Sequence, residues 1–465
     1  MTFGALPDDV LLETFELYLG KDDTIGYDYN HNYDGWQTLV HVCRRWRCIV
    51  FASPRRLDLK LYCTPQRSVS SETLNIWPEL PIVINSWRIW CKEDATNAIA
   101  LLKHHNRVCK IYYCDGQYQD SDSSLKEVAK IDKPFPALTS LELFSYAQNA
   151  PVLPDSFLGG SAPRLRSLYL NGIPYPSIGK LLSSTTNLAR LTLWRIPRSG
   201  YIAPEAIVPR LSMLAKLEVL HLGFEYLRSR AHQTSRHPPP LTRVVFHNLT
   251  TLHFHGDVGY LEDILFQIET PILNRSYFSF FNRLVFDTPL LGHFIRRTEI
   301  FMTIQTAQVE FYSQDVRVVL LGQEMDNHDG ASPKPLELRV SCKPLDWQLS
   351  AVAQVLNSLL SSLPALETLE IEVDRGDWPG NIEVTQWLEL LHPFTSVKKM
   401  TLVREISARL VAPALQELAR ERPTEVLPTL QELSLSTEPS GPVKEAIEQF
   451  ISIRRLCGRP VTVLY

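Results

Sequence analysis

The pattern Leu-x-x-Leu-x-Leu recurs along most of this 465-residue chain. It occurs five times between Leu138 and Phe254 and three times between Leu366 and Leu435, with another apolar residue replacing a leucine in some copies. The central leucines of the first five copies lie 27, 23, 29 and 32 positions apart: Leu141, Leu168, Leu191, Leu220 and Leu252. A short apolar pattern with such a period is typical of repeats that stack on one another. We therefore expect each copy to form one strand of a parallel sheet.

Weaker copies of the pattern extend the array in both directions and fill its central gap. We expect these strands at Leu57–Leu61, Pro81–Ile84, Val108–Tyr113, Tyr277–Phe280, Val309–Phe311, Leu336–Val340 and Val461–Tyr465. Three stretches between strands have a helical pattern: Ala203–Ala215, Leu349–Ser362 and Glu405–Glu421. Strands that alternate with helices predict an α/β solenoid, with a parallel sheet on its concave face.

The segment from Leu291 to Gly330 departs from this repeat. It contains two alternating apolar runs, Val309–Tyr312 and Val316–Leu321, which predict a short β excursion from the solenoid. The run Gln323–Ser332 is polar and acidic and contains glycine, so we expect a loop there.

The first 57 residues follow a helical pattern instead. Pro7, Asp8 and Asp9 are a helix-start signal, and the apolar residues from Val10 to Leu19 form a stripe wider than one buried helix face. A second apolar set follows helical spacing, and we interpret it as one continuous helix that ends at Ser53-Pro54: Leu39, Val42, Cys43, Trp46, Ile49 and Val50. So short a segment cannot bury this much apolar surface alone. It either packs on the rest of the chain or docks on a separate protein.

The run Leu6-Pro7-Asp8-Asp9-Val10-Leu11-Leu12, followed by LVHVCRRW at residues 39–46, resembles an F-box. The resemblance implies docking on the Skp1 adaptor of a cullin-type ubiquitin ligase. The residues implied in that contact are Leu6, Pro7, Val10, Leu11, Leu39, Val42, Cys43 and Trp46, and all of them except Cys43 are expected to be partly exposed in the isolated chain. The sequence departs from the family in a polar insertion from Gly20 to Gly35, which we expect to be a loop.

The repeats are similar to leucine-rich repeats, so the whole chain resembles the fungal F-box proteins with leucine-rich repeats. This implies an F-box over residues 1–57, a solenoid over residues 58–465, and a role as the substrate-recognition adaptor of a Skp1–cullin ligase. The adaptor would catalyse no reaction itself. Two alternatives remain open: a scaffold, bound to Skp1 or independent of it, outside any ligase, and an enzyme with an unrecognised site.

Residues between the leucines of each strand should point to the concave face. The early copies place aromatic, histidine and arginine side chains there, which favours binding of a target protein. The candidate target-binding residues are Phe144, Tyr169, Arg190, Trp194, His221, His253 and His255. Three histidines in one row would make binding sensitive to pH near their ordinary pKa of about 6.5. Ordinary strand composition is the competing explanation, because sheets favour aromatics in any case.

Nothing in the sequence predicts catalysis, a metal or a cofactor. The net charge is −4, which argues against nucleic-acid or membrane-surface binding. None of the 8 cysteines forms a Cys-x-x-Cys pair, so we expect reduced thiols and a cytoplasmic or nuclear protein. Cys43 and Cys48 are poorly placed for zinc if they share one helix. The histidines in His253-x-His255-x-Asp257 are expected to form an exposed polar ladder rather than a metal site.

Overall fold

The computed structural model describes residues 6–20, 35–64, 74, 80–86, 99–115, 125–147, 149–225, 243–281, 288–322, 335–341, 345–360, 363, 366–374, 383–421 and 426–465. Helices and largely parallel strands alternate there, which confirms the α/β class. The chain forms two compact units, the first of residues 1–188 and 199–201 and the second of residues 189–198 and 202–465. The loops predicted within Gly20–Gly35 and at Gln323–Ser332 lie outside the described residues.

The first unit begins with three helices, α1 (Asp8–Leu19), α2 (Gly35–Val42) and α3 (Arg44–Ala52). Pro7 precedes α1 as its N-cap, and the two carboxylates of the first turn suit the positive end of the helix dipole. The side chains buried among these helices are Leu11, Leu12, Phe15, Leu39, Val40, Ile49 and Val50.

The sequence prediction of one continuous helix from Leu39 to Val50 is wrong. The backbone of Cys43 is extended, with φ −159° and ψ 169°, and this separates α2 from α3. The Cys43 thiol accepts a hydrogen bond from the Trp46 N–H at 3.5 Å, so it acts as the N-cap of α3. At this break Val42 and Cys43 are exposed, whereas Val40, which the predicted stripe does not include, is fully buried.

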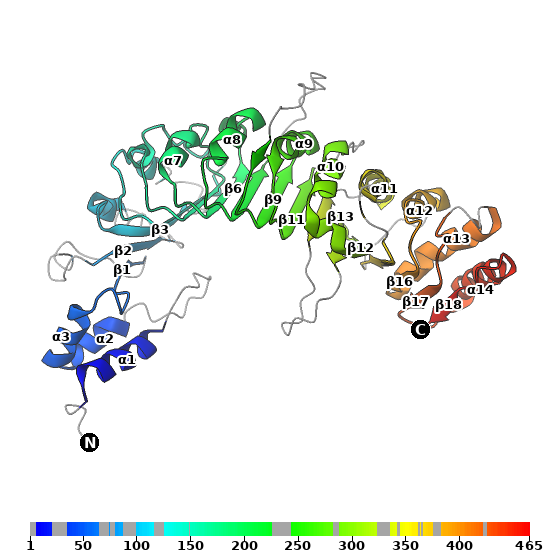
Figure 1. Ribbon diagram of the computed structural model, residues 1–465, viewed down its shortest axis with the longest axis horizontal. Helices are drawn as coiled ribbons and strands as arrows, with labels where there is room; N and C mark the ends of the chain where they lie inside the picture. Colours follow the sequence, from blue (N-terminus) through cyan, green and yellow to red (C-terminus); the bar gives the residue numbers. More distant parts are fainter. Residues whose placement is uncertain are drawn as a thin grey trace. The chain divides into compact units, whose positions relative to one another are not determined.

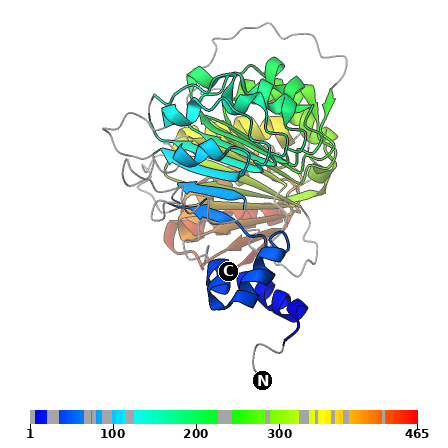
Figure 2. The same cartoon turned by 90° about the vertical axis from the view of Figure 1, so that its left-hand side faces the viewer.

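The strands of the first unit follow the helices and pair in parallel, in sequence order (Figure 2). They are β1 (Leu61–Cys63), β2 (Ile82–Ser86), β3 (Val108–Asp115), β4 (Ser140–Ser145) and β5 (Ser167–Asn171). The helical segments between them are η2 (Leu102–His104), α6 (Leu125–Ala129), η3 (Phe157–Gly160) and α7 (Ile178–Ser184).

The second unit continues the same alternation (Figure 1). Its main sheet has the strand order β6-β7-β9-β11-β14-β13-β12-β15-β16-β17-β18. The bounds are β6 (Arg190–Ile196), β7 (Val219–Phe224), β9 (Thr251–Gly256), β11 (Arg275–Phe280), β12 (Ile304–Phe311), β13 (Asp315–Gly322), β14 (Leu336–Ser341), β15 (Thr368–Val373), β16 (Lys399–Val403), β17 (Glu432–Leu435) and β18 (Thr462–Leu464). A separate parallel pair joins β8 (Val244–Val245) to β10 (Ile268–Glu269).

Helices of the second unit cover one face of this sheet and leave the other face open (Figure 1). They are α8 (Pro204–Leu211), α9 (Val258–Gln267), α10 (Pro289–Arg297), α11 (Leu345–Leu360), α12 (Val384–Leu391), α13 (Glu405–Glu421) and α14 (Gly441–Leu456), with the short turns η4 (Arg198–Gly200) and η5 (Glu299–Thr303). The repeated leucines are buried beneath the helices, and the residues between them lie on the opposite face. The strands and helices predicted from the repeats are present with one exception: Leu57–Leu61 is expected to be a strand, but the chain turns there, with Asp58 at φ 46°, and β1 begins only at Leu61.

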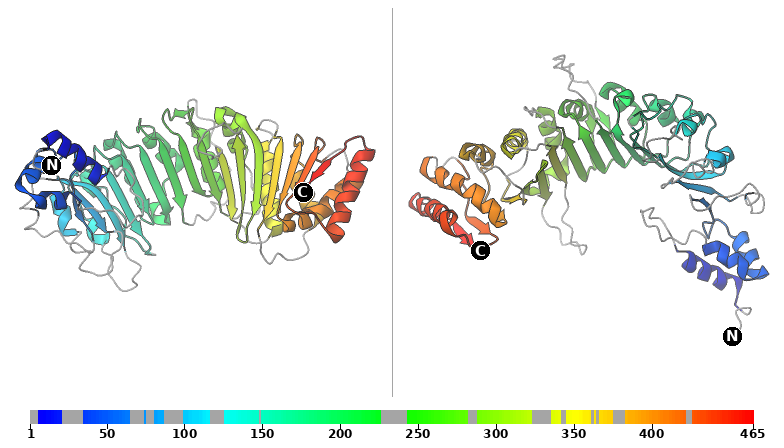
Figure 3. Two further views of the ribbon diagram at one scale, coloured as in Figure 1. Left: turned by 90° about the horizontal axis from the view of Figure 1, so that it is seen from below. Right: turned by 180° about the vertical axis from the view of Figure 1, so that it is seen from behind.

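The predicted β excursion is present at β12 and β13, but its pairing makes the sheet only mostly parallel. Strand β13 runs antiparallel to both β12 and β14, and β14 pairs in parallel with β11. After β11 the chain therefore skips two strand positions in the sheet and forms β12 in the third. It then fills the two skipped positions with β13 and β14, so that these three strands lie in the reverse of their chain order (Figure 3, left). Strand β12 then pairs in parallel with β15, and the regular order resumes.

Candidate interaction surfaces

The three N-terminal helices are held together by an aromatic contact and by hydrogen bonds at their surface. The rings of Phe15 and Trp46 lie 4.7 Å apart between centroids. Trp36 lies on α2 and donates its indole N–H to the carbonyl of Lys60 at 3.0 Å, which ties the helices to the start of the sheet. Arg45 donates to the Asp8 carboxylate and to the Leu6 carbonyl, both at 2.5 Å, and so holds the chain before α1 against α3.

The residues implied in Skp1 binding divide into two groups in the structure. Pro7, Val10, Val42 and Cys43 are exposed, and Leu6 and Trp46 are partly buried. Leu11 and Leu39 are buried, with 1% and 5% exposure, so the expectation that they are partly exposed is wrong. They face inward because the break at Cys43 lets three helices enclose a core of their own.

Two large apolar side chains that the family motif does not include are also exposed on α1. Leu17 is 84% exposed and Tyr18 is 52% exposed, compared with 42% for Val10 and 55% for Val42 on α2. The sequence signal for both was the width of the apolar stripe between Val10 and Leu19.

The candidate target-binding residues lie in both units. In the first unit, Phe144 on β4 and Tyr169 on β5 stack with 4.7 Å between ring centroids, but Phe144 is only 3% exposed. In the second unit, Arg190 is exposed at the first position of β6. The remaining candidates lie in two groups of contacting rings on the open face of the second unit, Trp194 with His255 and His221 with His253. With two further rings, this set is named here the aromatic row: Trp194, His221, His253, His255, Tyr277 and Phe281.

Cross-strand register explains how the aromatic row is built. His221 on β7 pairs with His253 on β9, and their rings stack at 4.0 Å; His253 pairs in turn with Tyr277 on β11, at 5.4 Å. Trp194 on β6 reaches across β7 to contact the ring of His255 at 5.5 Å. It does so over Gly223, where an added Cβ would lie 2.5 Å from the indole ring. A glycine inside a strand pattern is the sequence signal for such a close approach.

Burial changes the titration of these histidines. Burial, together with the neighbouring His253, lowers the pKa of His221 to about 4, and burial also lowers the pKa of His253 and of His255. The pKa of each histidine therefore lies below the ordinary value on which the predicted pH sensitivity of binding is based, because desolvation disfavours the charged imidazole. All three rings are neutral at pH 7.

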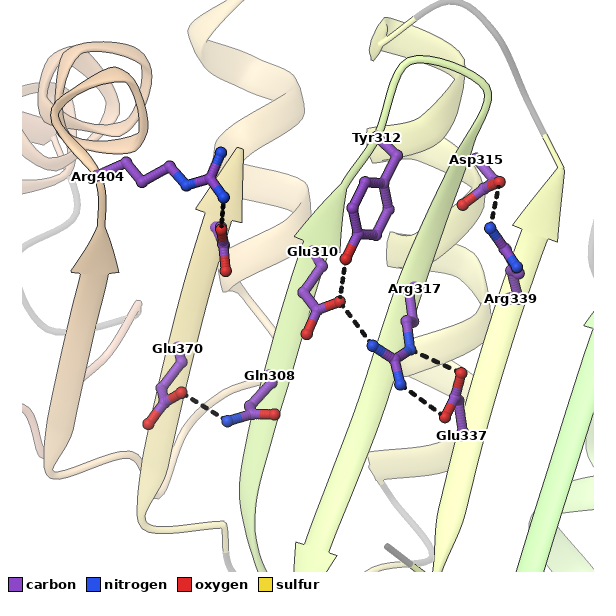
Figure 4. Close-up of polar contacts among 10 residues, drawn as sticks. Gln308, Glu310, Tyr312, Asp315, Arg317, Glu337, Arg339, Glu370 and Arg404 are labelled. Atoms are coloured by element: carbon purple, nitrogen blue, oxygen red, sulfur yellow. Dashed lines mark hydrogen bonds and ion pairs between the residues drawn. The ribbon is translucent and has the colours of Figure 1, made fainter. Parts of the chain in front are cut away.

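A set of charged side chains that the sequence interpretation missed continues the open face beyond β11 (Figure 4). Arg317 on β13 binds Glu337 on β14 through two bonds of 2.6 and 2.9 Å, and it also binds Glu310 on β12 at 3.0 Å. Tyr312 donates to the same Glu310 carboxylate at 2.6 Å. These bonds raise the pKa of Arg317, with the hydrogen bonds to Glu337 as the largest cause.

Four more contacts complete this set. Arg339 on β14 donates to Asp315 at 2.9 Å, Gln308 donates to Glu370 on β15 at 2.7 Å, and Arg404 binds Glu372 at 2.7 Å as well as Asp374. The six carboxylates are named here the acidic field: Glu310, Asp315, Glu337, Glu370, Glu372 and Asp374. The signal in the sequence was the charge alternation within the two β runs, at Glu310 and Arg317.

A scan against protein-family models finds no match to this chain, and a search of curated proteins finds none either. In the part of the chain that the structure describes, no helix is long and apolar enough to cross a membrane. Nor do its described His, Cys, Asp and Glu residues form a group of three or more that could hold a metal ion.

Proposed function

We propose that this chain is a substrate-recognition adaptor, which binds Skp1 through its N-terminal helices and a target protein through the open face of its sheet. It performs no bond chemistry in this role. By holding a target beside the ubiquitin-carrying enzyme, it raises the effective concentration of the target's lysines.

One observation carries the Skp1 half of the proposal. The three helices already bury Leu11, Phe15 and Leu39 among themselves, yet Val10, Leu17, Tyr18 and Val42 stay exposed. Apolar side chains contribute about 25 cal/mol per Å² when a partner removes them from water, so four such residues on one small helical segment favour docking. Val10 and Val42 belong to the two sequence runs that resemble the F-box.

The test compares two double variants of the full chain for binding to purified Skp1 by biolayer interferometry. Val10→Ser with Val42→Ser removes two exposed methyl pairs from α1 and α2. Val152→Ser with Val245→Ser is the matched control, since both of those valines are also exposed but lie outside the three helices. We expect the first pair to weaken binding at least tenfold, and the control to bind as the unmodified chain does.

Unchanged Skp1 binding by the Val10 and Val42 double variant, with an unchanged melting temperature, would overturn the assignment. The same purified chain is then incubated with Skp1 and a cullin. Recovery of all three together supports a ligase adaptor, whereas recovery of Skp1 without the cullin overturns that role in favour of a scaffold outside a ligase.

A further inference from the structure

The aromatic row and the acidic field adjoin each other on the open face of the second unit. Tyr277 on β11 pairs with His253 on one side and with Glu337 on the other. The row occupies β6, β7, β9 and β11, and the field occupies β14, β13, β12 and β15, which are eight consecutive strands of the sheet. Both surfaces belong to the same compact unit.

The acidic field carries more negative charge than its own arginines neutralise. Among the residues that the structure describes on these strands, six carboxylates face three arginines, and two of those arginines each bind two carboxylates: Arg317 binds Glu310 and Glu337, and Arg404 binds Glu372 and Asp374. The strands of the aromatic row contribute Arg190 and Arg275, both exposed at strand starts, and Arg195, which binds Glu225 just after β7, so among the described residues of these eight strands the negative excess lies on β12–β15.

We infer that the target presents an extended segment rich in lysine or arginine, which lies across this face from the aromatic row to the acidic field. This inference rests on the proposed function and names the class of target that the adaptor recognises. Charge complementarity selects the occupant: the net negative charge of the acidic field attracts a cationic segment and repels an acidic protein or a nucleic acid.

The aromatic row suits the same segment. The faces of Trp194 and Tyr277 attract ammonium and guanidinium groups through cation–π interactions. The lowered pKa values keep His221, His253 and His255 neutral at pH 7, so the histidines do not repel a cation. The acidic field and the aromatic row therefore both favour a positively charged ligand.

Strand spacing sets the length of the segment. Eight strands have seven intervals of about 4.8 Å each, so the face spans about 34 Å. An extended chain advances about 3.3 Å per residue, so roughly ten residues cross it.

The experiment uses the purified full chain and three fluorescein-labelled peptides of twelve residues. The peptides share the same alternating tyrosine and glycine positions and carry lysine, glutamine or glutamate at the others. Fluorescence anisotropy measures their binding at 50 and 200 mM salt. We expect the lysine peptide to bind at least tenfold more tightly than the glutamine peptide, to weaken at the higher salt concentration, and the glutamate peptide not to bind.

A charge-neutral variant locates the site. Glu370→Gln with Glu372→Gln keeps side-chain size and should weaken binding of the lysine peptide about tenfold, since two ion pairs are lost. Glu445→Gln with Glu448→Gln, both exposed on α14, is the matched control and should not change binding. Equal affinity for the lysine and glutamate peptides, or full binding by the Glu370 and Glu372 double variant, would overturn the inference.

This assay contains no Skp1, so its failure is distinct from failure of the proposed function. If the chain binds Skp1 but not the lysine peptide, the inference is wrong and the proposed adaptor role stands. If the chain binds the lysine peptide at this face but does not bind Skp1, the inferred binding surface stands and the proposed adaptor role is wrong.

Discussion

The imidazole rings of His221 and His253 stack in parallel on neighbouring strands, with 4.0 Å between centroids and 3° between planes. This arrangement holds two titratable rings in contact where burial disfavours charge on either of them. The native state consequently binds fewer protons than the unfolded chain in weak acid.

Weak acid should therefore destabilise the fold. The pKa of His221 falls from 6.5 to about 4 on folding, so its stabilising effect is complete above pH 6.5 and is lost as the pH falls toward 4. The loss is at most roughly 3 kcal/mol for this group. Melting temperatures between pH 7 and 4.5 measure it. His221→Gln should flatten the decline, and an equally steep decline in that variant would contradict the assignment.

Trp194 and Gly223 should be strongly coupled. Gly223→Ala places a Cβ 2.5 Å from the indole ring, and overpacking of this kind costs about 1–3 kcal/mol. In a Trp194→Val background, the same change should cost much less because the ring is gone. Denaturation of the two single variants and the double variant gives the coupling energy. Simple additivity would show that the indole does not occupy this position.

Glu262 connects two successive helices of the second unit. Its buried carboxylate on α9 accepts the N–H groups of Leu290 and Leu291, at 2.8 and 2.6 Å, and so caps the start of α10. Glu262→Ala should destabilise the unit by about 2–4 kcal/mol, because it leaves those buried donors without their acceptor. Glu205→Ala, at an exposed position on α8, is the control for thermal unfolding. An equal melting temperature for the two variants would refute the cap.

Replacement of Arg317 by lysine should lower the stability of the second unit. Its guanidinium bridges Glu310 and Glu337 with a fork geometry that a single ammonium group cannot reproduce. Arg317→Met should cost about 1–3 kcal/mol, since it leaves two half-buried carboxylates unneutralised. Adding Glu310→Gln and Glu337→Gln should restore most of that loss, as measured by thermal unfolding. If the triple variant is less stable than Arg317→Met, repulsion between the carboxylates is not the cause.

The repeats were predictable because a strand at the core buries every second residue on one face. The alternation at Leu220 and Leu222 can be recognised from the sequence alone, and both side chains are buried in the structure. The break at Cys43 was not predictable in the same way. No glycine or proline marks it, and the helical spacing of Leu39, Val42 and Trp46 continues across it.

The acidic field escaped prediction for a different reason. Glu310, Arg317 and Glu337 belong to three strands whose order in the sheet is the reverse of their order in the chain. Local periodicity identifies each strand but carries no information on its partners. The pKa shift of His221 is equally non-local, because it depends on how deeply the neighbouring strands bury the ring.

The reversed strands also affect how this chain reaches its native state. Arg275 pairs with Thr251, 24 positions earlier, whereas Leu336 pairs with Ser276, 60 positions earlier. A regular solenoid folds by adding one neighbour at a time. Here β12 and β13 lie in the chain between β11 and the strand that pairs with it, which is β14. The longer loop must close before β14 can pair with β11, and this closure costs entropy before the new contacts form. Pairing of β12, β13 and β14 should accordingly be the slow step for folding that spreads along the sheet from β6 through β11 toward β15.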